Sequence, residues 1–139
     1  MILTQPDCEL WTCDYLRAHI RDVPDLQVDN RTPDDYDGSC PLIVVNDIPG
    51  PLIHNIGWDW TLGVTVRGWT KQNSKPCKDL ARRVHALLTA DPDIALTDGS
   101  PFCVPSSSSG PTPVGGDPLT CRYYMTIDYV VRGTIESND

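Results

Sequence analysis

The sequence predicts an α+β domain in which a mostly antiparallel or mixed sheet of about four to five strands carries two helices on one face. Three observations predict this class. Apolar residues recur at helical spacing in two segments, at about 5–21 and 77–90. Apolar and polar residues alternate in two others, at 58–70 and 121–135. A continuous β-branched run at 42–45 adds a strand that is covered on both faces.

The first helix is expected over about 5–21. Thr4 is suited to cap it, and Pro6 lies in the first turn, where a missing N–H group costs no hydrogen bond. Asp7 places an acidic side chain near the positive end of the helix dipole. The helix should end before Pro24, because the residue that precedes a proline disfavours helical conformation.

The next segments predict strands joined by turns. A short strand is expected at 26–30 and a polar, acidic turn at 32–38. Residues 47–51, which include two prolines and a glycine, should end the strand at 42–45. We expect the segment 47–57 to form a protruding arm between two strands.

The tryptophans of the strand at 58–70 are expected to have two different roles. Trp58 and Trp60 fall on its apolar face, so we expect both indoles in the core. Trp69 has the opposite parity, and we expect it to be exposed. Exposed tryptophans on a sheet face or edge are enriched at protein interfaces, which makes Trp69 a candidate contact.

The second helix and the C-terminal part complete the prediction. Between 77 and 90 the helix carries an apolar stripe with charged residues opposite. Residues 97–119 are rich in Pro, Ser and Gly and predict a long loop, in which 102–104 could pair briefly as an edge strand. Loops of this length inside a domain are often functional. The last strand is expected at 121–135.

Length and charge limit the classes of function. The chain has 139 residues and is expected to form one domain over 1–139. Its net charge is −8, with 11 basic and 19 acidic residues, which argues against a nucleic-acid-binding module. The apolar runs are shorter than the roughly 18–20 residues that cross a bilayer, and the N-terminal residues lack the features of a signal peptide. We therefore expect a protein that is made in the cytosol and does not act at a membrane.

The sequence contains no motif that predicts catalysis. It has no G-x-S-x-G, Walker or dinucleotide-binding glycine pattern, and its six cysteines show no C-x-x-C spacing. His19, His54 and His85 are far apart in the sequence. We expect no catalytic residue, no metal site and no cofactor, and cysteines that stay reduced and pack as small apolar residues. A single late disulfide and a small cytosolic enzyme with a Cys/His nucleophile remain alternatives.

Four features follow one another along most of the chain. They are a capped helix (D-C-E-L-W-T-C-D-Y-L-R, 7–17), a strand (P-L-I-V-V, 41–45), a strand that leads into an amphipathic helix (W-T-L-G-V-T-V-R-G-W-T, 60–70, and A-R-R-V-H-A-L-L, 81–88), and a C-terminal strand ending Y-V-V-R-G (129–133). In this order they resemble the tail terminator proteins of long-tailed (siphophage-type) bacteriophages, the minor tail protein U group.

The resemblance implies a structural virion protein at the tail-neck junction, assembled in the host cytoplasm. Such a protein forms a ring, usually a hexamer, that caps the tail tube and stops its polymerisation. It then joins the tail to the head-to-tail connector or stopper protein. DNA would pass through the lumen without specific binding, which suits an acidic chain.

The candidate subunit contacts are the exposed tryptophan, one tyrosine of the last strand and the arm: Trp69, Tyr124, Ile48, Leu52, Ile53 and His54. The Pro/Ser/Gly content of 97–119 and the number of cysteines depart from the family pattern. Alternatives are another neck component such as a head-closure protein, the Cys/His enzyme, and a monomeric regulatory binder.

Overall fold

The main sheet of the computed structural model, which describes residues 2–53 and 57–136, has the strand order β2-β3-β4-β6-β5. The elements in chain order are β1 (Ile2–Thr4), α1 (Cys8–His19), β2 (Gln27–Asp29), β3 (Leu42–Ile53), β4 (Gly57–Gly68), α2 (Lys75–Thr89), the short 3₁₀ helix η1 (Ile94–Leu96), β5 (Phe102–Pro113), β6 (Cys121–Arg132) and β7 (Thr134–Glu136). β2 is parallel to β3, and the other neighbouring pairs of this sheet are antiparallel.

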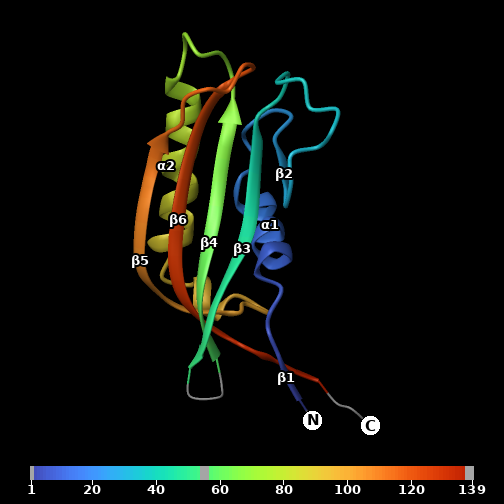
Figure 1. Ribbon diagram of the computed structural model, residues 1–139, viewed down its shortest axis with the longest axis vertical. Coiled ribbons are helices and arrows are strands. Elements are labelled where there is room, and N and C mark those ends of the chain that lie inside the picture. Colours follow the sequence, from blue (N-terminus) through green and yellow to red (C-terminus); the bar gives the residue numbers. More distant parts are fainter. Residues whose placement is uncertain (1, 54–56, 137–139) are drawn as a thin grey trace.

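Both helices cover one face of this sheet (Figure 1). The predicted α+β class is therefore confirmed, and the main sheet has five strands. A second, two-stranded sheet of β1 and β7 is added to it, which the sequence did not predict.

The core lies between the helices and the sheet, where the alternation along β4 places its apolar side chains. Trp60 and Leu62 point toward the helices and are buried, and Trp58 packs against the same cluster from a partly buried position. The stripe of α2 fills the facing layer with Cys77, Leu80, Ala81, Val84 and Leu88. Each Val or Leu buried in this way stabilises the fold by about 1.5–3 kcal/mol. The second predicted helix and the core positions of Trp58 and Trp60 are thus confirmed.

The first helix begins later than predicted, and Asp7 rather than Thr4 caps it. Asp7 Oδ1 accepts a hydrogen bond from the backbone N–H of Leu10 at 3.0 Å. Thr4 belongs to β1 and pairs with Thr134 of β7. This pairing holds Ile2–Thr4 in an extended conformation, so these residues are not available to the helix.

β3 is much longer than predicted, because the Pro-Gly-Pro segment does not end it. The strand continues to Ile53 and pairs with β4, with a bulge between Pro49 and Leu52 that accommodates the residues without a regular partner. The described residues of the predicted arm, 47–53 and 57, therefore belong to a long β3–β4 pair of strands that extends beyond the helices (Figure 1).

The predicted loop at 97–119 is wrong over residues 105–113: the edge pairing expected at 102–104 is present, and the strand β5 continues to Pro113. Two of the three register shifts in β5 lie beside Pro105 or across Pro111. Prolines are tolerated at a sheet edge because no neighbour needs their missing N–H. Serine hydroxyls supply further contacts: Ser106 Oγ donates to the carbonyl of Asp128 at 3.1 Å. A polar composition that is typical of loops is thus compatible with a strand on the solvent side of a sheet.

The last predicted strand is divided at Gly133 into β6 and β7. A Cβ added at Gly133 would lie 2.6 Å from Leu3 Cγ and 2.8 Å from Trp58 Cζ3. Glycine therefore allows the chain to pass between Leu3 of β1 and Trp58 of β4 before it pairs with β1.

Candidate interaction surfaces

The face of the sheet that points away from the helices exposes two of the predicted contact residues side by side. Ile48 of β3 is 45% exposed and Tyr124 of β6 is 38% exposed. They converge over Gly63 of β4, where an added Cβ would lie 2.7 Å from Tyr124 Oη and 3.5 Å from Ile48 Cδ1. We call Ile48, Gly63 and Tyr124 the open patch. Both residues were predicted as contacts from the sequence, and the register of the strands brings their side chains together.

A polar network adjoins the open patch. Asp128 accepts hydrogen bonds from Ser107 Oγ at 2.6 Å and from Thr61 Oγ1 at 2.7 Å. These two hydroxyl donors lower the pKa of Asp128. A hollow of about 400 Å³ lies beside the network and is lined in part by Ile48 and Asp59. The sequence did not reveal this network, since the serines were assigned to a loop.

The arm carries two further predicted contact residues within the described part of the chain. Leu52 is 50% exposed and lies opposite Trp58 in the β3–β4 ladder, and Ile53 is half-buried. His54 lies outside the described residues. The arm thus carries exposed apolar surface away from the body of the domain.

Trp69 is not exposed as the parity of its strand predicted. It follows the end of β4 with a left-handed φ of 55° and packs, half-buried, against the core. Its neighbours Val23 and Pro76 line a shallow groove beside it. The strand ends at Gly68, so alternation no longer determines where the next side chain points.

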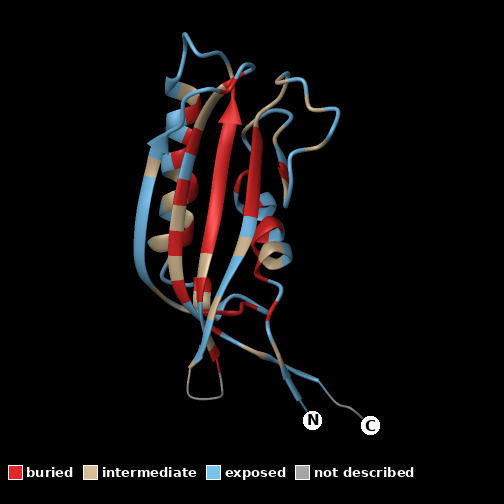
Figure 2. Ribbon diagram, in the orientation of Figure 1, coloured by how far each residue is buried: buried red, intermediate tan, exposed pale blue. Residues whose placement is uncertain are grey.

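The upper half of the same sheet face is sealed. Arg67 Nη2 lies 2.7 Å from Asp117 Oδ2, with both side chains almost fully buried, and the guanidinium lies 4.7 Å from the centre of the Tyr36 ring. Burial alone would raise the pKa of Asp117, but the N–H groups of Leu119 and Thr120, together with Arg67, outweigh burial and lower it. Figure 2 shows that the upper parts of β3 and β4 are buried, whereas the lower part of β3 and most of β5 are exposed.

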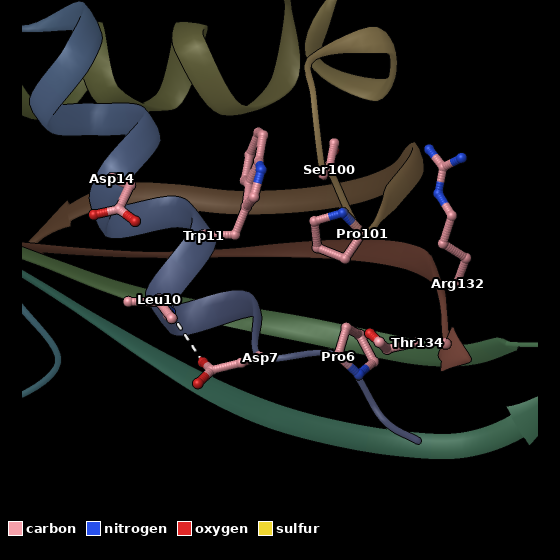
Figure 3. Close-up of a pocket in the computed structure, with 11 residues that line it drawn as sticks. Pro6, Asp7, Leu10, Trp11, Asp14, Ser100, Pro101, Arg132 and Thr134 are labelled. Atoms are coloured by element: carbon pink, nitrogen blue, oxygen red, sulfur yellow. Dashed lines mark hydrogen bonds between the residues drawn. The ribbon is translucent and has the colours of Figure 1, made fainter. Parts of the chain in front are cut away.

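A cleft of about 510 Å³ lies between α1, the segment before β5 and the end of β6. Figure 3 shows Trp11, Pro6 and Pro101 around it, with Asp14 on the α1 side and Arg132 on the opposite side. Arg132 Nη2 donates to the carbonyl oxygens of Ala95 and Phe102 at 3.0 and 2.9 Å. These bonds join the end of β6 to η1 and to the first residue of β5.

An acidic groove of about 220 Å³ lies at the α1/β2 edge of the domain. Its acidic lining residues are Asp7, Glu9 and Asp29, and Arg17 is its basic residue. Glu9, Asp7 and Asp47 have carboxylate oxygens close enough to share a cation. These groups already have protein partners: Glu9 accepts the N–H of Asp47 at 2.9 Å, and Asp47 accepts the indole N–H of Trp60 at 3.0 Å.

The thiols of the core have the wrong environment for nucleophilic catalysis. Burial raises the pKa of Cys77 to about 12 and that of Cys13 to about 11, and it raises the pKa of Cys8 further. A reactive cysteine has a lowered pKa. The hydrogen bonds found for the two described histidines go to Tyr15, Ser108 and Thr89, not to a thiol.

No helix within the described residues is long and apolar enough to cross a membrane. No family model and no curated protein sequence matches the chain.

Proposed function

We propose that this chain is a structural virion protein of a long-tailed phage, which forms a ring on the tail tube and ends its polymerisation. In this role it joins the tail to the connector or stopper protein of the head and has no enzymatic activity. The proposal rests on the resemblance described above together with the surfaces of the fold.

The apolar end of the β3–β4 hairpin is the observation that carries the proposal. Ile48 and Leu52 are about half exposed, and Tyr124 lies beside Ile48 on the same sheet face. Exposed apolar side chains next to a polar network are typical of protein–protein interfaces, whose centres are apolar and whose rims are polar. A hairpin that extends beyond the body suits contact with the next ring or tube subunit.

The charge of the chain supports a role beside DNA without affinity for it. A net charge of −8 opposes binding to phosphates. A channel protein benefits from this repulsion, since DNA must move through the lumen without being retained.

The Cys/His enzyme is the weaker alternative. Burial raises the thiol pKa of Cys8, Cys13 and Cys77. Thiolate chemistry near neutral pH needs the opposite shift. Binding to protein subunits accounts for the exposed hairpin, which the enzyme hypothesis leaves unexplained.

Light scattering coupled to size-exclusion chromatography, with negative-stain imaging, tests the proposal. We expect a ring, or a monomer that forms rings on added tail tubes and stops their elongation. A chain that stays monomeric and leaves tube growth unchanged would rule the proposal out. Alkylation rates of the thiols would then test the enzyme alternative.

A further inference from the structure

The basic residues of the chain are concentrated in one segment. Residues 71–83 contain five of the eleven basic residues and one of the nineteen acidic ones. Most of this segment lies in the first half of α2. The remaining parts of the chain are therefore strongly acidic, and the domain has opposite charges at different places on its surface.

Three basic side chains of α2 are exposed, and two of them lie on the flank that carries His85, which faces β5. His85 Nε2 bonds to Ser108 of β5 at 3.0 Å, and Lys78 and Arg82 precede it by seven and three residues on the same helical flank. Lys75 and Arg82 flank Asp79 at 3.0 and 3.8 Å, which leaves the flank with a positive surplus. We call Lys75, Lys78 and Arg82 the basic flank.

Arg83 belongs to the opposite flank of α2. It pairs with Asp22 at 2.7 Å and donates to the carbonyl of His19. These contacts point it toward α1 of the same chain. The side chains of the basic flank are exposed.

The acidic groove lies at the opposite edge of the sheet. Its acidic residues Asp7, Glu9 and Asp29 are joined on the exposed side of α1 by Asp14, whose side chain is 66% exposed. Arg17 is the basic residue of this groove, and it pairs with Asp14 and donates to the carbonyl of Val28. An exposed apolar side chain, Leu10, lies among these charges.

One residue of each charged surface, Asp29 of the groove and Lys78 of the flank, lies near the same height along the strands. Asp29 is the register partner of Val44, and Val44 is the partner of Thr65. At the α2 edge, Cys77 Sγ contacts the carbonyl oxygen of Val66, one residue further along β4, and Lys78 follows directly. If each copy binds the next through opposite edges at equal height, successive copies are related by a rotation with little shift along the strands. Such an assembly can close into a ring rather than grow into a filament.

We propose that the basic flank of one copy docks on the acidic groove of the next copy, in a head-to-tail contact that closes the ring. This inference rests on the proposed function and names the contact between subunits. Lys78 and Arg82 would face Asp14 and Asp29, and Leu10 would be covered at the centre of the contact. Such charge complementarity guides orientation and suppresses face-to-face pairing of like surfaces.

Charge reversal on one face at a time tests this contact. The first variant carries Lys78→Glu and Arg82→Glu, and the second carries Asp14→Lys and Asp29→Lys. Each alone places like charges across every contact, so we expect at least about a tenfold rise in the concentration required for assembly. In an equal mixture, the reversed flank of the first variant meets the reversed groove of the second, and the unchanged flank of the second meets the unchanged groove of the first. Both contacts join opposite charges, so we expect rings to form again.

A matched control reverses two exposed acidic residues away from the groove, with Asp34→Lys and Asp35→Lys. This control should assemble like the unchanged chain, and circular dichroism should show that all variants are folded. The readout is the mass distribution from light scattering at low ionic strength, with tail tubes added where the chain needs them.

The outcomes separate this inference from the proposed function. Rings that form equally well from each single-face variant would overturn the contact while leaving the ring itself in place. Failure of the mixture to assemble would also overturn it. An unchanged chain that never forms a ring, even on tail tubes, would overturn both proposals.

Discussion

The two halves of the outer sheet face have the same alternating strands but different surroundings. At the upper end Leu42 is fully buried and Arg67 pairs with Asp117. Further down the same side of the sheet Ile48 is exposed, and Tyr124, whose backbone pairs with Thr65 and whose hydroxyl reaches Gly63, is exposed beside it. The segments around Tyr36 and Asp117 seal only the first region. The comparison indicates that the upper half contributes to stability, whereas the lower half is available to partners.

Asp117→Ala should have the largest effect on stability. It leaves the buried guanidinium of Arg67 without its carboxylate and leaves the N–H groups of Leu119 and Thr120 without an acceptor. We expect a loss of about 3–5 kcal/mol in the free energy of unfolding, measured by urea denaturation. Asp59→Ala, at an exposed position, is the control. An equal loss of unfolding free energy in both variants would contradict the claim that the upper half is sealed.

Truncation of an aliphatic side chain compares the two halves directly. Leu42→Ala should cost about 2–5 kcal/mol, because it opens a cavity in a fully buried site. Ile48→Ala should cost less than about 1 kcal/mol, because its side chain is already close to half exposed. Denaturant midpoints of the two variants measure the difference, and similar losses would show that both halves are packed alike.

The sealed half should also make stability depend on pH. The pKa of Asp117 is lower in the folded chain than its ordinary value, so its contribution is fully present above the unfolded pKa of about 3.9. It is lost as the pH falls through the folded pKa. Between about pH 5 and pH 3 the unchanged chain should therefore lose more stability than Asp117→Asn. Parallel loss in both proteins would show that Asp117 does not carry this dependence.

The polar network beside the open patch should contribute less. Ser107→Ala removes one hydroxyl donor to Asp128, whose other donor, Thr61, remains. We expect a cost of about 1 kcal/mol in unfolding free energy and a rise in the pKa of Asp128. NMR titration of the carboxylate in both proteins measures the pKa. An unchanged pKa would show that the serine hydroxyl does not stabilise the charged form.

The central part of the fold was predictable because its local pattern and its tertiary role agree. Trp60 and Leu62 alternate with polar residues and are buried as expected, and the stripe around Val84 docks α2. The incorrect predictions of secondary structure have a common cause. Thr4 pairs with β7 rather than capping α1, and the serines near 106 find partners in β6. In both places a distant strand determines the conformation, and local sequence does not contain that information.

The candidate site was predicted in part for a similar reason. Ile48 was predicted as a contact because it belongs to the arm, and Tyr124 as a residue of the last strand, yet their convergence over Gly63 depends on the β3–β4–β6 register. Trp69 was assigned to the surface because alternation was extended past the end of β4. The opposed charged edges also required the fold, since only the order of strands places Asp29 and Lys78 at opposite edges of the sheet.

A double variant of the open patch tests the central claim most directly. Ile48→Ser with Tyr124→Ser should change the free energy of unfolding by no more than about 1 kcal/mol, since both positions are partly exposed. Negative-stain imaging of tail tubes grown with either protein then measures capping. We predict that the unchanged chain caps the tubes and limits their length, while the folded double variant leaves them uncapped and longer. Tubes that grow to the same length without the chain, with it, and with the variant would contradict the account.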